Sequence, residues 1–206
     1  MRKVARKTTT TNLSHAIVGL KSETGELLQG LHAYILGTQL NDAMRSNARE
    51  ELGDIAYYTT VLCKVLKIKM PTSSKKVALK NMTLTDALLR IDGVATDLLD
   101  QYKKSFYGRD LDMLKIAEIA QPLPALLYAI NYTLFHDTIS VTMDGNVAKL
   151  AARYPEGFFT DTAQQSRDKE VEINAMHESV DAGQQPATPL KKPLIIKKAA
   201  PKQQAA

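Results

Sequence analysis

The stretch GELLQGLHAYILGTQLND, residues 25–42, decides the fold because a related stretch follows 71 residues later. It aligns without gaps with TDLLDQYKKSFYGRDLDM, residues 96–113, and Gly37 then falls on Gly108. The same register continues beyond it, where ELGDIAYY, residues 51–58, aligns with PLPALLYA. A shared glycine and one register across both segments indicate an internal repeat.

Apolar residues on each side of these stretches recur with the period of a helix. In the first copy they predict one helix from Leu13 and another over residues 41–66. In the second copy they predict helices over residues 84–107 and 111–135, the latter bent or begun near Pro122 and Pro124. Sustained alternation typical of strands is missing from the sequence. We therefore expect an all-α fold, in which two helical hairpins form a four-helix core.

Composition divides the chain into an arm, a domain and a tail. Residues 1–11 read as a flexible basic arm, residues 12–177 as one helical domain, and residues 178–206 as a disordered tail rich in Pro, Ala and Lys. Within the domain we expect hairpin one at 12–66, a connector at 67–82, hairpin two at 83–135 and a C-terminal helical segment at 145–176.

The charge distribution argues against nucleic acid as the main partner. The chain carries a formal charge of +5, but each end contributes +4 and residues 11–178 carry −3. The single cysteine, Cys63, excludes an internal disulfide, and we expect no membrane span and a cytoplasmic location. The basic ends leave open a second function, binding of nucleic acid or an acidic partner, and the tail could dock an unknown partner.

Four acidic residues occupy unexpected places on the first two helices. Glu23 lies where the apolar stripe needs its next member, and Glu26 follows three residues later. Glu51 and Asp54 repeat this spacing on the next helix. A pair of acids three residues apart usually marks a solvated helix face. Two pairs on apolar stripes instead predict that the four carboxylates converge when the helices form an antiparallel hairpin.

Four anions in a half-buried interface would repel one another, and a hard divalent cation would relieve that repulsion. We therefore expect a Mg²⁺ site, with Mn²⁺ as a substitute. Gly25 and Gly53 each precede the second acid of a pair, which predicts close approach of the helices there. The aligned positions of hairpin two retain one acid, and they read Val94, Asp97, Pro122 and Ala125.

These motifs carry a resemblance to a known family. The E-x-x-E and E-x-x-D pairs resemble those of the all-α nucleoside triphosphate pyrophosphohydrolases, which include MazG-like proteins, dimeric dUTPases and their phage relatives. NVAKLAARYPEGFF, residues 146–159, followed by AQQSRD, looks like the closing segment of many MazG-like chains. YKKSFYGRDLD, residues 102–112, looks like the end of helix one in such proteins. The resemblance is to a phage or bacterial member.

The resemblance implies hydrolysis of a (deoxy)nucleoside triphosphate between its α and β phosphates, giving a monophosphate and pyrophosphate. It implies that the catalytic, metal-binding acids are Glu23, Glu26, Glu51 and Asp54. It also implies nucleotide contacts from the closing segment, made by Asn146, Lys149 and Arg153. The spacing of these three by itself is equally typical of a solvated helix face.

Two aspects of this function stay open. Typical members of the family carry one hairpin and assemble as dimers or tetramers. This chain carries an acidic hairpin and a second hairpin with one acid left, so a single chain could imitate a dimer, although we expect a homodimer. The alternative function is a catalytically inactive protein of the same fold that binds nucleotide or a partner.

Overall fold

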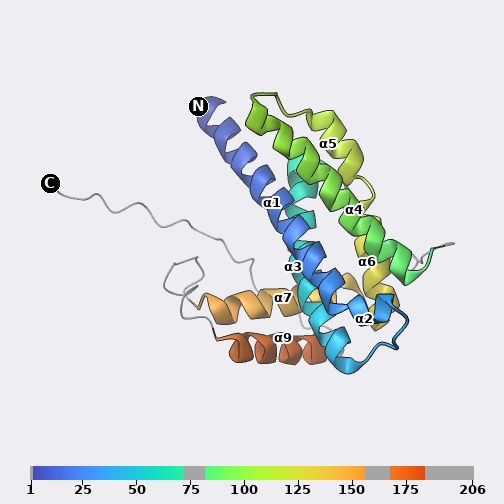
Figure 1. The fold of residues 1–206 in the computed structure, drawn as a ribbon. Helices are drawn as coiled ribbons and strands as arrows, with labels where there is room; N and C mark the ends of the chain where they lie inside the picture. Colours follow the sequence, from blue (N-terminus) through green and yellow to red (C-terminus); the bar gives the residue numbers. More distant parts are fainter. Residues whose placement is uncertain (1, 72–81, 156–167, 184–206) are drawn as a thin grey trace. The chain divides into compact units, whose positions relative to one another are not determined.

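The computed structural model describes the backbone of residues 2–71, 82–155 and 168–183, and the side chains of these ranges from residue 12 onward. Every regular element in these ranges is a helix (Figure 1), which confirms the predicted all-α fold. The elements are α1 (Arg2–Gly30), α2 (His32–Ile35), α3 (Asp42–Leu66), α4 (Leu84–Lys103), the 3₁₀ helix η1 (Lys104–Tyr107), α5 (Met113–Ala120), α6 (Leu123–Phe135), α7 (Ile139–Arg153) and α9 (Lys169–Gly183). The chain divides into two units, Met1–Met143 and Asp144–Ala206, and each is described by itself.

Helix α1 begins earlier than the sequence predicts. It starts at Arg2, so residues 2–11 continue the first helix where an arm ahead of it was expected. Residues 2–18 contain neither glycine nor proline. Each residue added to an existing helix gains a backbone hydrogen bond without a new nucleation step, which favours such an extension.

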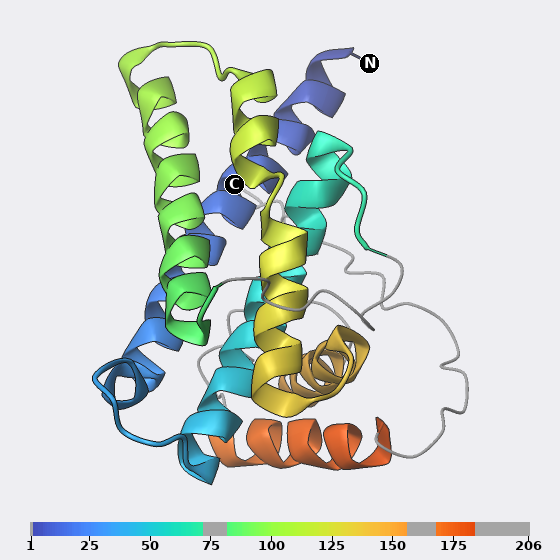
Figure 2. The same cartoon turned by 90° about the vertical axis from the view of Figure 1, so that its right-hand side faces the viewer.

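The first hairpin consists of α1 and α3, which run antiparallel and side by side (Figure 2). Gly19 of α1 lies against Tyr58 of α3, and Gly30 lies against Asn47. The chain turns between the helices at Gly37, whose φ of 98° suits glycine. At the start of α3, the Asn41 side chain accepts a hydrogen bond of 2.8 Å from the Met44 N–H.

The second hairpin repeats these turning points 71 residues later, in agreement with the predicted repeat. Gly108 corresponds to Gly37 and also has a positive φ, 73°. Asp112 corresponds to Asn41, and its side chain caps α5 by accepting a hydrogen bond of 3.0 Å from the Lys115 N–H. Local backbone geometry therefore recurs at the positions that the sequence alignment pairs.

The second arm of hairpin two is broken, as the prolines predict. Helix α5 ends at Ala120 and α6 begins at Leu123, with Pro122 between them. A proline has no N–H to donate and its ring clashes with the preceding turn, so the helix cannot pass through unbroken. Pro122 aligns with Glu51, and the second hairpin is therefore interrupted where the first carries an acid.

The two hairpins meet through α1 and α4, at positions that the repeat makes equivalent. The Lys21 ammonium forms an ion pair with the carboxylate of Asp92, which stands 71 residues further along. Thr24, which is fully buried, donates a hydrogen bond of 2.8 Å to the same carboxylate. Contact between equivalent residues is the signature of a local two-fold relation, here within one chain.

Arg49 ties α3 to the segment after α6. Its guanidinium donates to Asp137 Oδ2 at 2.8 Å and to Thr142 Oγ1 at 3.1 Å. The same group lies 3.8 Å from the centre of the Phe135 ring. Asn131 donates to Asp137 as well, at 3.0 Å to Oδ1. These contacts fix the half of α3 that precedes Glu51.

One stretch of the described chain, Met113–Phe135, is long and apolar enough by composition to cross a membrane. By length and composition alone, this stretch is an exception to the expectation that the chain has no membrane span. In the structure the stretch is divided between α5 and α6, and Ile116, Leu127 and Ile130 lie in the hydrophobic core. The finding is compatible with the core helices of a soluble protein, which pass the same test.

The second unit contains the end of α7 and all of α9. Helix α9 continues to Gly183, so the predicted start of the tail at residue 178 is wrong. Met176 and Val180 lie four residues apart on α9 and are both buried. The buried face of the helix therefore extends beyond residue 178. The predicted closing segment lies partly outside the described residues, as do most of the connector and the tail from residue 184 onward.

Two glycine substitutions should have opposite effects on stability. A Cβ at Gly19 would lie 2.2 Å from a carbon of the Tyr58 ring, whereas a Cβ at Gly93 would meet nothing within 4 Å. We expect Gly19→Ala to lower the free energy of unfolding by about 1–3 kcal/mol through overpacking. Gly93→Ala should raise it by up to about 1 kcal/mol through helix propensity. Urea denaturation measures both, and shifts in the same direction would contradict the described packing.

Candidate metal centre and adjoining cavity

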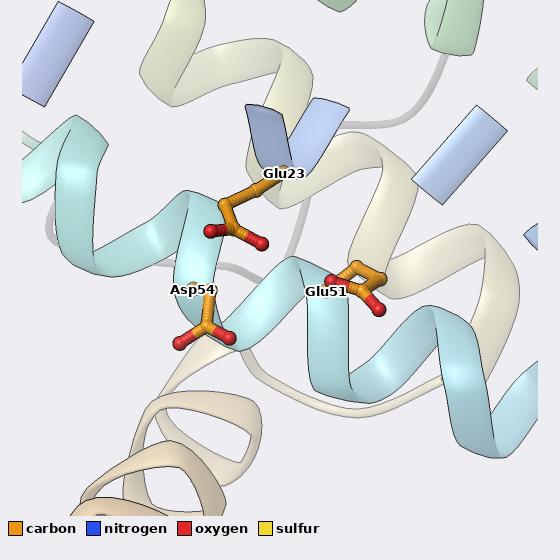
Figure 3. A group of neighbouring side chains, drawn as sticks. All are labelled: Glu23, Glu51 and Asp54. Atoms are coloured by element: carbon orange, nitrogen blue, oxygen red, sulfur yellow. The ribbon is translucent and has the colours of Figure 1, made fainter. Parts of the chain in front are cut away.

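Three carboxylates converge between α1 and α3. Glu23 projects from α1, and Glu51 and Asp54 project from α3 (Figure 3). One oxygen from each lies within 4.8 Å of the others. We call these three residues the carboxylate triad. Three of the four acids predicted to converge therefore do so.

The local sequence explains why the triad faces inward. Glu23 lies between Leu20 and Leu27 on α1, and both leucines are fully buried. On α3, Glu51 is 7% exposed and is followed by the buried Leu52. Side chains three and four residues apart share a helix face, so the apolar stripes that pack the two helices also turn these acids toward each other.

Burial and neighbouring like charges act on Glu51 within the triad. Burial first, and then repulsion from Glu26, Glu50, Glu23 and Asp54, together raise the pKa of Glu51 from 4.5 to about 8. The Asn47 amide donates a long hydrogen bond of 3.4 Å to Glu51 Oε1. The free energy of the site therefore favours a proton, or another cation, on Glu51.

The triad fits a hard divalent ion. Carboxylate oxygens are the ligands that Mg²⁺ and Mn²⁺ prefer, and Mg²⁺ sites commonly use few carboxylates and complete their shell with water and phosphate. A bound cation would also reverse the charge repulsion that raises the pKa of Glu51. Glu23, Glu51 and Asp54 are the residues that could hold such an ion.

Glu26 does not belong to the triad. It is exposed and accepts a hydrogen bond of 3.3 Å from Ser22 Oγ on the same helix. The carboxylates within 4.8 Å of one another include three of the four predicted acids, while Glu26 is the strongest of the like charges acting on Glu51 and stays a predicted ligand. Its carboxylate instead lines a neighbouring cavity.

This cavity has a volume of about 440 Å³ and lies where α1 and the start of α3 meet. It shares Glu51 with the triad. The other lining residues are Glu26, Gln29, Gly30, Asn41, Ala43, Met44 and Asn47. Sequence reasoning missed the cavity, although the amide-rich positions Gln29, Asn41 and Asn47 on the flanks of the acid pairs could have indicated a polar binding surface.

Close approach of the two helices occurs at Gly30, where the sequence did not place it. A Cβ at Gly30 would lie 1.8 Å from Asn47 Oδ1, whereas a Cβ at Gly25 would meet nothing within 4 Å. The role predicted for Gly25 is therefore wrong. The spacing of Gly25 from the acids gave its place along α1 but could not give its direction around the helix relative to α3.

The three residues predicted to contact nucleotide all lie in the second unit, on α7. Asn146 and Lys149 are buried. Arg153 donates to both carboxylate oxygens of the buried Glu172, at 2.9 Å from Nε and 2.6 Å from a terminal nitrogen. Within this unit Arg153 therefore joins α7 to α9, and its contact with nucleotide stays a prediction, as do those of Asn146 and Lys149.

Comparison with known proteins does not identify a family. No family model, no curated protein and no solved structure matches the chain. The triad, the cavity and the sequence motifs are therefore the features that bear on its function.

The acidic cluster predicts a pH dependence of stability. Because the folded state holds the Glu51 proton more tightly than the unfolded chain, it binds more protons between pH 4.5 and about 8. The metal-free protein should therefore lose free energy of unfolding as the pH rises through this window, by at most about 1.4 kcal/mol per pH unit from this group. Chemical denaturation in the presence of a chelator at several pH values measures the slope.

Two variants isolate the source of this slope. Glu51→Gln should flatten it and leave the protein at least as stable as the wild type at pH 8, because the repelling charge is gone. Asp97→Asn changes an exposed acid at the position of hairpin two that corresponds to Glu26, and should leave the slope unchanged. An equal slope in wild type and Glu51→Gln would show that the buried acid is not its origin.

Proposed function

We propose that this protein is a Mg²⁺-dependent nucleoside triphosphate pyrophosphohydrolase, which releases a nucleoside monophosphate and pyrophosphate. The observation that carries the proposal is the convergence of Glu23, Glu51 and Asp54 within 4.8 Å of one another across two helices. The resemblance of these acid pairs to those of the all-α pyrophosphohydrolases supports it.

The triad suits phosphoryl chemistry because such reactions depend on positioning and charge neutralisation more than on covalent catalysis by the protein. When bound, Mg²⁺ would neutralise phosphate charge and lower the pKa of an attacking water. Glu23, Glu51 and Asp54 would hold it, so that their negative charge does not repel the triphosphate. Without that cation, the same carboxylates would oppose substrate binding.

The protein's own part in the reaction is to place the water and accept its proton. Water attacks the α-phosphorus, the bond from that phosphorus to the bridging oxygen breaks, and pyrophosphate leaves with the bonding electrons. A carboxylate of the acidic cluster takes the proton of the water. The α1–α3 pairing fixes these groups on rigid helices, which favours a single geometry at the reacting phosphate.

Release of monophosphate and pyrophosphate from a panel of ribo- and deoxyribonucleoside triphosphates tests this proposal. We expect turnover with Mg²⁺ or Mn²⁺, none with chelator, and a loss of at least about a hundredfold in kcat for Glu51→Gln. Asp97→Asn should keep wild-type turnover, since it is exposed and belongs to hairpin two.

Two results would count against the proposal. Turnover that persists in chelator would remove the role of the metal. Nucleotide binding without turnover on any triphosphate would instead favour a binding protein of the same fold. Because Glu51→Gln relieves repulsion in the folded protein, its loss of activity could not be assigned to unfolding, and a thermal melt of the variant checks this point.

A further inference from the structure

A cavity opens beside the triad. It shares the Glu51 side chain with the triad, and its volume of about 440 Å³ falls in the range of small-molecule sites, roughly 300–1,000 Å³. A ligand whose phosphates lie at the triad would therefore have room for its remaining part in this cavity.

Polarity changes in steps along the cavity. Because α1 and α3 are antiparallel, residues further along α1 face earlier residues of α3. Glu26 and Glu51, which itself belongs to the triad, therefore line the end of the cavity next to the triad. The amides of Gln29 and Asn47 come next, and the apolar side chains of Ala43 and Met44 lie at the far end with Asn41.

This lining rejects phosphate and accepts an uncharged guest. Among the described residues that line the cavity, two are acidic and none is Lys, Arg or His. Without a cation, a polyphosphate would meet only repulsion there. The carboxylate and amide groups could instead form hydrogen bonds with the polar edge of an uncharged ring system. The Met44 side chain could pack against the face of that ring.

The amides at the middle and far end have hydrogen-bonding capacity to spare. The Asn41 oxygen already caps α3, which leaves its NH₂ group as a donor. Asn47 Oδ1 is buried and has no hydrogen-bond partner in the described structure. An unsatisfied buried acceptor is unfavourable, and a small rotation of this amide toward an N–H group in the cavity would give it a hydrogen-bond partner.

We propose that this cavity is the nucleoside pocket of the site, in which the amides of Gln29, Asn41 and Asn47 read the edge of the base. This inference rests on the proposed function for the orientation of the nucleotide, with phosphates at the triad and the base toward Met44. The cavity then determines which nucleotides are bound, and the triad determines that they are hydrolysed.

Filling the cavity tests the assignment directly. Ala43 is exposed, lies in the first turn of α3 and lines the cavity, so Ala43→Trp blocks it without burying a new residue in the core. Its equivalent in hairpin two is Leu114, which is exposed in the first turn of α5. Leu114→Trp is therefore a matched control for adding the same indole to the other copy of the repeat.

Two measurements on the full chain separate this inference from the proposed hydrolysis. We expect Ala43→Trp to raise KM for triphosphates at least about tenfold, while Leu114→Trp leaves it unchanged. Ligand-observed NMR with uncharged nucleosides, without metal, should show binding to wild type and Leu114→Trp and its loss in Ala43→Trp.

Each outcome decides between the two claims. A wild-type KM in Ala43→Trp overturns the cavity assignment. The assignment is also overturned if the wild-type protein binds neither nucleosides nor triphosphates. Absence of turnover in wild type, with nucleoside binding that is lost in Ala43→Trp, overturns the proposed hydrolysis and supports the cavity as a nucleoside pocket. Unchanged Mn²⁺ binding in Ala43→Trp shows that the triad is intact in this variant.

Discussion

The antiparallel packing of α1 against α3 is the interaction on which the candidate site depends. It brings Glu23 to Glu51 and Asp54, and it buries Glu51 among like charges so that its pKa rises to about 8. Such a cluster destabilises a helix pair unless a proton or a cation compensates it. The apolar stripes of both helices supply the opposing free energy, because leucines above and below the acids are fully buried. Burial of these leucines thus holds together carboxylates that would otherwise repel one another.

The repeat shows what the acids add to the fold. Hairpin two reproduces the glycine turn and the capped start of the following helix without the acid pairs, and Pro122 breaks the helix where Glu51 stands in hairpin one. The hairpin therefore does not require carboxylates at these positions. Lys21 and Asp92, equivalent residues in contact, join the two copies as an isologous pair would join two subunits. One copy carries the candidate chemistry and the other supports it.

Periodicity and turn chemistry predicted most of the architecture, because apolar spacing, Gly37, Gly108 and the prolines each act locally. The same signals located the triad. They could not separate Glu26 from it, since helical spacing gives the face of a residue but not the register between two helices. For the same reason the close approach fell at Gly30 and not at Gly25. The cavity was not predicted either, because it arises from the angle and offset of two packed helices.

Anomalous diffraction from a crystal of the protein with Mn²⁺ would show whether the carboxylate triad binds a divalent cation. We expect an anomalous peak at coordination distance, roughly 2.0–2.3 Å, from oxygens of Glu23, Glu51 and Asp54. The peak should be missing in a crystal of Glu51→Gln. A Mn²⁺ peak at other residues, with no peak at the triad, would show that the triad is not the metal centre.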